Sequence, residues 1–191
     1  YYIAFIILYR FAEGFVMKIV PLFLKAGREI GGLGLSEQEI GIYYGTYGAA
    51  AFVLGSLLAG YYISRRGLKK TLFSLCCTFN LPFIAYTLLA IYQPTSGMLI
   101  GGAIVLEYFG YGFGFVGLTL FMMQQVAPGK HQMAHYAFAS GIMNLGVMLP
   151  GMVSGFVSDW LGYRDFFIFI LFATIPAFLI TYFVPFTYCL L

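Results

Sequence analysis

Six stretches of the chain are long enough and apolar enough to cross a lipid bilayer as helices. A spanning helix needs about 20 consecutive, mostly apolar residues. The stretches cover residues 1–24, 39–64, 68–92, 97–126, 133–158 and 165–188. They do not alternate apolar and polar positions as barrel strands do: Leu99–Leu106, for example, reads LIGGAIVL. Short loops separate the stretches, so we expect consecutive helices to be antiparallel.

The composition excludes most other classes of protein. Charged residues make up only 9% of the 191 residues and hydrophobic residues 61%, whereas a soluble domain has about 25% charged residues. A net charge of +3 is too small for a nucleic-acid-binding surface. The cysteines, Cys76, Cys77 and Cys189, show neither disulfide nor metal-ligand spacing. We therefore expect an all-α membrane protein with the lipid bilayer as a partner, no nucleic acid, no metal and no cofactor.

Two segments half a chain apart share a glycine pattern. Residues 60–67 read GYYISRRG and residues 155–162 read GFVSDWLG, a shift of 95 residues from Gly60 to Gly155. Within a single bundle over residues 1–191, this pattern predicts two copies of a three-helix unit, residues 1–92 and 97–188. Because three is odd, the copies have opposite orientations, an arrangement typical of transporters. A chance match among 24 glycines is the alternative.

The loop charges favour one orientation in the membrane. Cytoplasmic loops carry an excess of Lys and Arg, and the second loop has four: Arg65, Arg66, Lys69 and Lys70. We expect this loop and both ends of the chain to lie on the cytoplasmic side.

Four charged residues lie well inside the apolar stretches, away from their ends. Arg10, Glu13 and Lys18 lie in the first stretch, and Glu107 lies in the fourth. A charge at the bilayer centre costs about 2.5–3.5 kcal/mol, so these residues should face protein or a water-filled cavity. We predict that Arg10 and Glu13 line a cavity and bind substrate. The alternative is an ion pair that only holds helices together, and Lys18 can instead extend toward the interface.

Glu107 is the candidate for proton coupling. Its stretch contains no basic residue, and apolar surroundings favour the neutral form of a carboxyl group. Such a group can take up and release a proton near physiological pH. The alternative is a permanently ionised Glu107 paired with Arg10 or Lys18.

Two further residues are candidates for substrate binding. Asn144, in the fifth stretch, can hydrogen-bond a sugar or peptide group, or else a neighbouring helix. Tyr47, beside two other tyrosines, can stack on a sugar or belong to an interfacial aromatic belt. Proline bends helices, so Pro82 and Pro150 predict interruptions in the third and fifth stretches.

The second loop resembles the loop signature of the major facilitator superfamily, G-x3-D-[RK]-x-G-[RK]-[RK]-[RK]. The matching residues are Gly60, Arg65, Gly67, Lys69 and Lys70. Ser64 replaces the aspartate and Leu68 replaces a basic residue. The resemblance implies a cytoplasmic gating loop between the second and third helices of a six-helix half.

Three longer segments are similar, in order, to the second half of AmpG-type muropeptide permeases, a branch of that superfamily. They are YRFAEG at 9–14, EYFGYGFG at 107–114 and SGIMNLG at 140–146. The resemblance implies the C-terminal six-helix half of a transporter in the bacterial inner membrane, with an N-terminal six-helix half as partner. It also implies proton-coupled import of cell-wall muropeptides by alternating access.

Other functions stay open at this stage. Acetyl-CoA transporters share the same branch, so the substrate can be a nucleotide-linked acyl group or a sugar. A non-transporting membrane receptor or assembly module needs only the same scaffold. An enzyme is not expected, because His131 and His135 alone are too few ligands for a zinc site.

Overall fold

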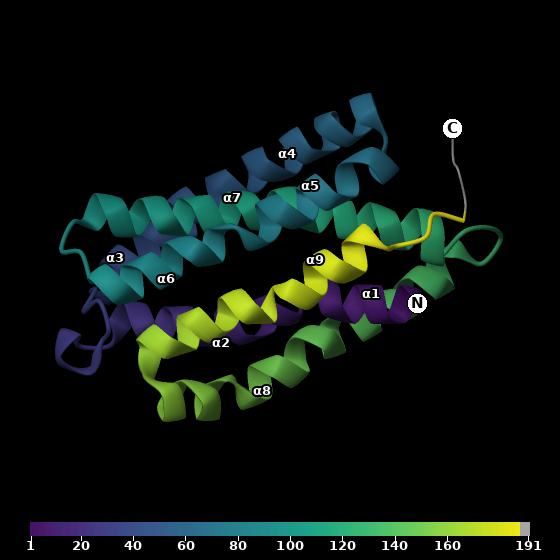
Figure 1. The fold of residues 1–191 in the computed structure, drawn as a ribbon. Coiled ribbons are helices and arrows are strands. Elements are labelled where there is room, and N and C mark those ends of the chain that lie inside the picture. The colour runs from purple at the N-terminus through teal and green to yellow at the C-terminus, as the bar shows by residue number, and fades with distance from the viewer. Residues whose placement is uncertain (188–191) are drawn as a thin grey trace.

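Long helices that run side by side make up the structure (Figure 1). The computed structural model describes residues 1–187, and no strand occurs in that range. The helices are α1 (Tyr2–Tyr9), α2 (Phe11–Lys25), η1 (Arg28–Ile30), α3 (Glu37–Gly41), η2 (Ile42–Gly48), α4 (Ala49–Arg66), α5 (Leu68–Asn80), α6 (Pro82–Tyr92), α7 (Gly97–Phe121), η3 (Met122–Val126), α8 (Gln132–Ala173) and α9 (Ile175–Tyr182). The predicted all-α fold is confirmed. Residue 188 at the end of the last predicted stretch, and Cys189, lie outside the described residues.

Four continuous helical segments have the length and apolarity needed to cross a membrane. They are Glu37–Arg66, Leu68–Tyr92, Gly97–Val126 and Gln132–Tyr182. The first predicted stretch is divided into α1 and α2, because Arg10 leaves the helical conformation (φ −107°, ψ 10°). The fifth and sixth predicted stretches run together in α8, which contains one non-helical residue, Gly162 (φ 75°, ψ 164°).

Only one of the two predicted proline interruptions is found. α5 ends at Asn80 and α6 begins with Pro82, because proline has no N–H to continue the helical hydrogen bonds. Pro150 lies inside α8 without a break in its backbone angles, so that prediction is wrong. Its ring packs on Gly14 of α2, where a Cβ would lie 3.0 Å away. Support from a neighbouring helix lets a membrane helix continue through proline.

Close helix crossings occur where one of the two helices has a glycine at the contact. α4 packs along α7, and α2 packs along α8. A Cβ on Gly55 would collide with the carbonyl oxygen of Phe109, and one on Gly112 would collide with that of Phe52. Small residues allow such close approach in membranes, where lipid provides little hydrophobic drive between helices.

Two clusters of buried side chains form the interior. One lies among α2, α6, α8 and the first part of α7, and includes Phe23 and Phe167; the other lies among α1, α5, α9 and the second part of α7, and includes Phe5 and Phe121. Large apolar side chains also cover the outside, among them Phe156 and Trp160, which is 85% exposed. An apolar exterior of this kind suits contact with lipid rather than water.

We expect Gly162→Ala to destabilise the protein by about 1–3 kcal/mol, because its φ and ψ lie in a region that essentially only glycine adopts. Gly141→Ala is the matched control, since Gly141 lies within the same helix and has no other atom near its absent Cβ. Thermal stability in detergent, followed by size-exclusion chromatography, measures both. Equal stability of the two variants would contradict the prediction.

Candidate functional site

Arg10 and Glu13 form a buried ion pair where α1 gives way to α2. Arg10 Nε lies 2.6 Å from Glu13 Oε2, and Nη2 lies 2.7 Å from Oε1. The two side chains are only 6% and 5% exposed. Two parallel charge-assisted hydrogen bonds satisfy both oxygens of the carboxylate. The ion pair considered from the sequence is therefore present.

Aromatic side chains of α7 hold the arginine from the other side. Its guanidinium carbon lies 5.2 Å from the ring centre of Phe115 and 5.8 Å from that of Tyr111. Arg10 Nη2 also lies 3.5 Å from the Tyr111 hydroxyl, and the Tyr9 hydroxyl donates to the Gly114 carbonyl at 3.1 Å. Cation–π contacts of a desolvated arginine are attractive. Arg10, at the break between α1 and α2, is therefore held against α7.

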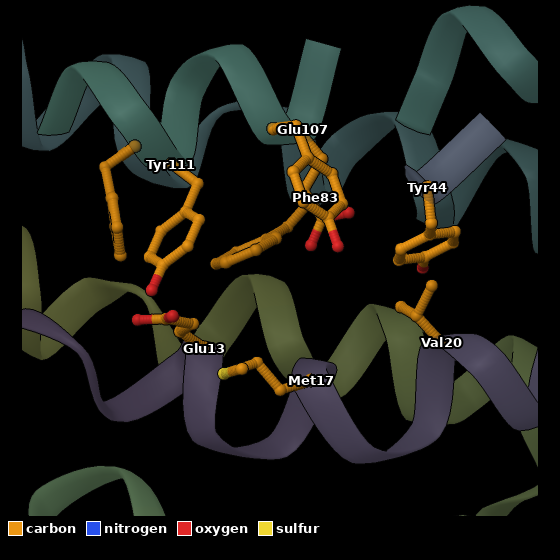
Figure 2. A pocket seen from close by; sticks show the side chains of 9 residues that line it. Glu13, Met17, Val20, Tyr44, Phe83, Glu107 and Tyr111 are labelled. Atoms are coloured by element: carbon orange, nitrogen blue, oxygen red, sulfur yellow. The ribbon is translucent and has the colours of Figure 1, made fainter. Parts of the chain in front are cut away.

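Glu13 is also part of the wall of a small cavity inside the bundle. The lining residues are Glu13, Met17, Val20, Tyr44, Phe79, Phe83, Glu107, Tyr108 and Tyr111. Figure 2 shows Glu13 on one side of this cavity and Glu107 with Tyr111 on the other. The cavity measures about 80 Å³, which holds a few water molecules but is well below the roughly 300–1,000 Å³ of ligand pockets.

Glu107 has a tyrosine, not a cation, as its partner. The buried Tyr86 hydroxyl on α6 donates a hydrogen bond to Glu107 Oε2. The ion pairs within residues 1–187 are Arg10–Glu13 and Lys25–Glu37, so Glu107 pairs with neither Arg10 nor Lys18 there. Lys18 is exposed. Two carboxyl groups thus line the cavity, and among the described residues Glu13 is paired with a cation whereas Glu107 is not.

A π-helical segment, η2 (Ile42–Gly48), shapes one end of the cavity. Its wider turn is rare and frequent at functional sites. Tyr44 lines the cavity and packs edge-on against Tyr108, with ring centres 5.2 Å apart. Tyr47, by contrast, is 54% exposed and lines an apolar groove between α4 and α7.

The other predicted site residues lie apart from the cavity. Asn144 is exposed on α8 and makes no hydrogen bond to the described residues. In the second loop, Arg65, Lys69 and Lys70 are exposed, Gly60 is half-buried, and Gly67 has φ 78°.

The departures of that loop from the signature have a structural consequence. Leu68, which replaces a basic residue, is buried in the core. Ser64, which replaces the aspartate, uses its hydroxyl to bond the Tyr61 carbonyl within its own helix. The loop cations have no ion-pair partner in the part of the chain that the structure describes.

Tyr86, Tyr44 and Tyr111 were not identified as site residues from the sequence. Tyr86 and Tyr111 lie in different helices from the charged groups that they contact, Glu107 and Arg10. Tyr44 lies in a tyrosine-rich segment whose sequence spacing does not single it out. The available signal was the hydroxyl of Tyr86 in an apolar stretch, because a buried tyrosine hydroxyl usually has a partner. The sequence does not say which partner.

A family model described as "Major Facilitator Superfamily" matches residues 3–187. The chain belongs to the Major Facilitator Superfamily. The superfamily fits an apolar helical bundle with a charged internal cavity, and it is a family of transporters rather than enzymes. The resemblance noted in the sequence is therefore confirmed.

Curated relatives in the superfamily are similar to the chain at low identity. The chain is 24% identical over 92% of its length to "Putative transporter AmpG 1" of Rickettsia bellii, of which it covers 41%. It is 25% identical over 90% of its length to "Anhydromuropeptide permease" of Escherichia coli K12, of which it covers 33%. An "Uncharacterized protein" of Haemophilus influenzae is 25% identical over 96% of the chain, which covers 43% of that protein. The chain thus spans less than half the length of these relatives.

We expect Glu13→Ala to destabilise the protein by about 3–5 kcal/mol, because it leaves Arg10 charged and unpaired in the interior. Glu37→Ala, which breaks the exposed Lys25–Glu37 pair, should leave the melting temperature unchanged. The double variant Arg10→Met/Glu13→Met should recover much of the loss, since apolar residues can replace a buried ion pair. Equal losses for Glu13→Ala and Glu37→Ala in thermal unfolding would contradict this.

Proposed function

We propose that the chain is one six-helix half of a proton-coupled secondary transporter that imports cell-wall muropeptides by alternating access across the bacterial inner membrane. The observation that carries the proposal is Glu107, a carboxyl group that faces an internal cavity and is paired with no cation among residues 1–187. Superfamily membership and the printed names of the permease relatives support the substrate class.

In this proposal, the helices are grouped into six membrane crossings. α1 and α2 together form the first, and α3, η2 and α4 form the second. α5 with α6 and α7 with η3 form the third and fourth. The backbone of Gly162 leaves the helical conformation and divides α8 in two. The first part of α8 forms the fifth crossing, and the second part together with α9 forms the sixth. The length of relatives more than twice that of the chain supports a second, N-terminal half as partner.

Backbone geometry supports two inverted repeats, residues 1–92 and 97–188. Gly67 (φ 78°, ψ 148°) ends α4, and Gly162 (φ 75°, ψ 164°) ends the first part of α8. These equivalent glycines of the repeated pattern therefore have nearly the same rare conformation. The close crossings match as well, because Gly14 packs on Pro150 and Gly55 packs on Phe109. A shift of 95 residues relates 14 to 109 and 55 to 150.

The cavity is too small to hold a muropeptide by itself. Its volume of about 80 Å³ supports a site that is completed by a second wall from the N-terminal half. Glu13 lines the cavity, whereas Arg10, which the sequence also placed on the cavity wall, is not among its lining residues. In this proposal, Arg10 and Glu13 bind polar groups of the substrate only when their ion pair opens during the conformational change. Asn144 and Tyr47, both exposed, contact the substrate from the edge of the half. The second loop, through Gly60, Arg65, Gly67, Lys69 and Lys70, gates the cytoplasmic side.

The charge of Glu107 links proton uptake to the conformational change. Closing the cavity removes water from Glu107, and an ionised carboxylate is costly in dry membrane surroundings. A protonated Glu107 avoids this cost, whereas Glu13 remains neutralised by Arg10 in either state. Closure is therefore favoured after Glu107 has taken up a proton, which couples proton entry to the movement.

We expect Glu107→Gln to abolish proton-driven accumulation but to preserve substrate exchange, because a neutral amide imitates the protonated state permanently. Uptake and counterflow of a radiolabelled anhydro-muropeptide into proteoliposomes of the full transporter measure the two activities. Glu29→Gln, an exposed loop substitution, is the control. Uphill accumulation by Glu107→Gln would refute the coupling role.

The proposed orientation predicts opposite labelling of two loops. In a background without the native cysteines, Lys69→Cys should react with a membrane-impermeant maleimide only from the cytoplasmic side. Arg28→Cys, in the loop after α2, should react only from the opposite side. Inverted and right-side-out vesicles separate the two cases. Labelling of both positions from the same side would contradict the antiparallel arrangement and the orientation.

A further inference from the structure

The hydrogen bond from Tyr86 makes the two carboxylate oxygens of Glu107 different from each other. Tyr86 donates to Oε2, whereas Oε1 has no hydrogen-bond partner in the described range and is not enclosed. The carboxyl group itself lines the cavity (Figure 2). One oxygen is thus held by the protein, and the other is available to cavity water.

The tyrosine is itself held rigidly. It is fully buried, and its ring stacks on Phe167 with centres 5.9 Å apart and planes 21° apart. The next residue, Thr87, donates its hydroxyl to the Phe167 carbonyl at 3.1 Å. These contacts hold α6 against the second part of α8 and keep the Tyr86 ring in place beside Glu107.

The remaining groups around Glu107 do not supply a comparable bond. Glu13 faces it from α2, and Arg10 beyond it is occupied by Glu13. Tyr44 of η2 and two tyrosines of α7, Tyr108 and Tyr111, line the same cavity. α5 contributes only Phe79. Within residues 1–187, Tyr86 is therefore the direct hydrogen-bond donor to this carboxyl group.

We propose that Tyr86 is a positioning residue for proton coupling: its hydroxyl fixes Oε2 of Glu107, stabilises the ionised carboxylate and leaves Oε1 toward the cavity to exchange the proton with water. The inference rests on the proposed coupling role of Glu107 and adds the residue that sets the pH range of that step. A hydrogen bond donated to a carboxylate favours its ionised form. Loss of the bond makes protonation occur at higher pH.

The test uses the full transporter and two readouts. The carboxyl stretching band in infrared spectra reports the protonation of Glu107 directly and should disappear in Glu107→Gln. The pH profile of anhydro-muropeptide uptake reports its use in transport. With Tyr86→Phe, which keeps the stacked ring, we expect both midpoints to move to higher pH by about one unit.

Two further variants separate the hydrogen bond from packing. Tyr108→Phe removes a hydroxyl that lines the same cavity but makes no hydrogen bond to the described residues, and it should leave both midpoints in place. Replacement of Tyr86 by 3,5-difluorotyrosine, a stronger donor of similar shape, should move the midpoints to lower pH.

The possible failures are distinguishable. Unchanged midpoints in Tyr86→Phe overturn the inference. An equal shift in the pH profile of substrate exchange, which Glu107→Gln preserves, also overturns it when Tyr86→Phe is added to that variant. Accumulation that survives Glu107→Gln overturns the proposed function instead. A shifted infrared midpoint in Tyr86→Phe would in that case show only that the hydroxyl stabilises the ionised Glu107, because this readout does not depend on transport.

Discussion

The described residues include two buried or half-buried carboxyl groups, Glu13 and Glu107, and one buried cation, Arg10. This imbalance determines what the site can do. An ionised group in apolar surroundings must be paired or must give up its charge. Arg10 directs two of its donors to Glu13 and rests on the faces of Tyr111 and Phe115. It therefore neutralises one carboxylate completely. Glu107 is left with a neutral hydroxyl, so a proton is the remaining way to remove its charge.

Glycine determines how closely the helices surround this site. At Gly55, Gly112 and Gly14, the backbone of one helix meets another without an intervening side chain, which brings α4 and α2 close to their partners α7 and α8. At Gly67 and Gly162 the backbone turns in a way that other residues resist.

The sequence predicted the helical class and the residues of greatest chemical interest, because twenty-residue apolar stretches and the charges within them are local signals. The division at Asn80 and Pro82 was predictable for the same reason. The break at Arg10 was not, since it depends on an ion pair and on rings from α7. Pro150 was misjudged because its support comes from Gly14, far away in sequence. Tyr86 was missed because its partner Glu107 is on another helix, and the placement of Tyr47 and Asn144 away from the cavity depends on helix rotation that periodicity alone does not fix.

The size of the cavity gives the electrostatic imbalance a physical role. A space of about 80 Å³ has room for a few water molecules beside the free oxygen of Glu107. Small changes in the tilt of α2 relative to α7 would add or remove a large share of that water, because Glu13 and Glu107 lie on opposite walls (Figure 2). The cost of ionising Glu107 then depends steeply on the conformation, whereas the cost of the closed Arg10–Glu13 pair hardly changes. In the proposed mechanism, a single carboxyl group thus makes the energy of the bundle depend on one proton.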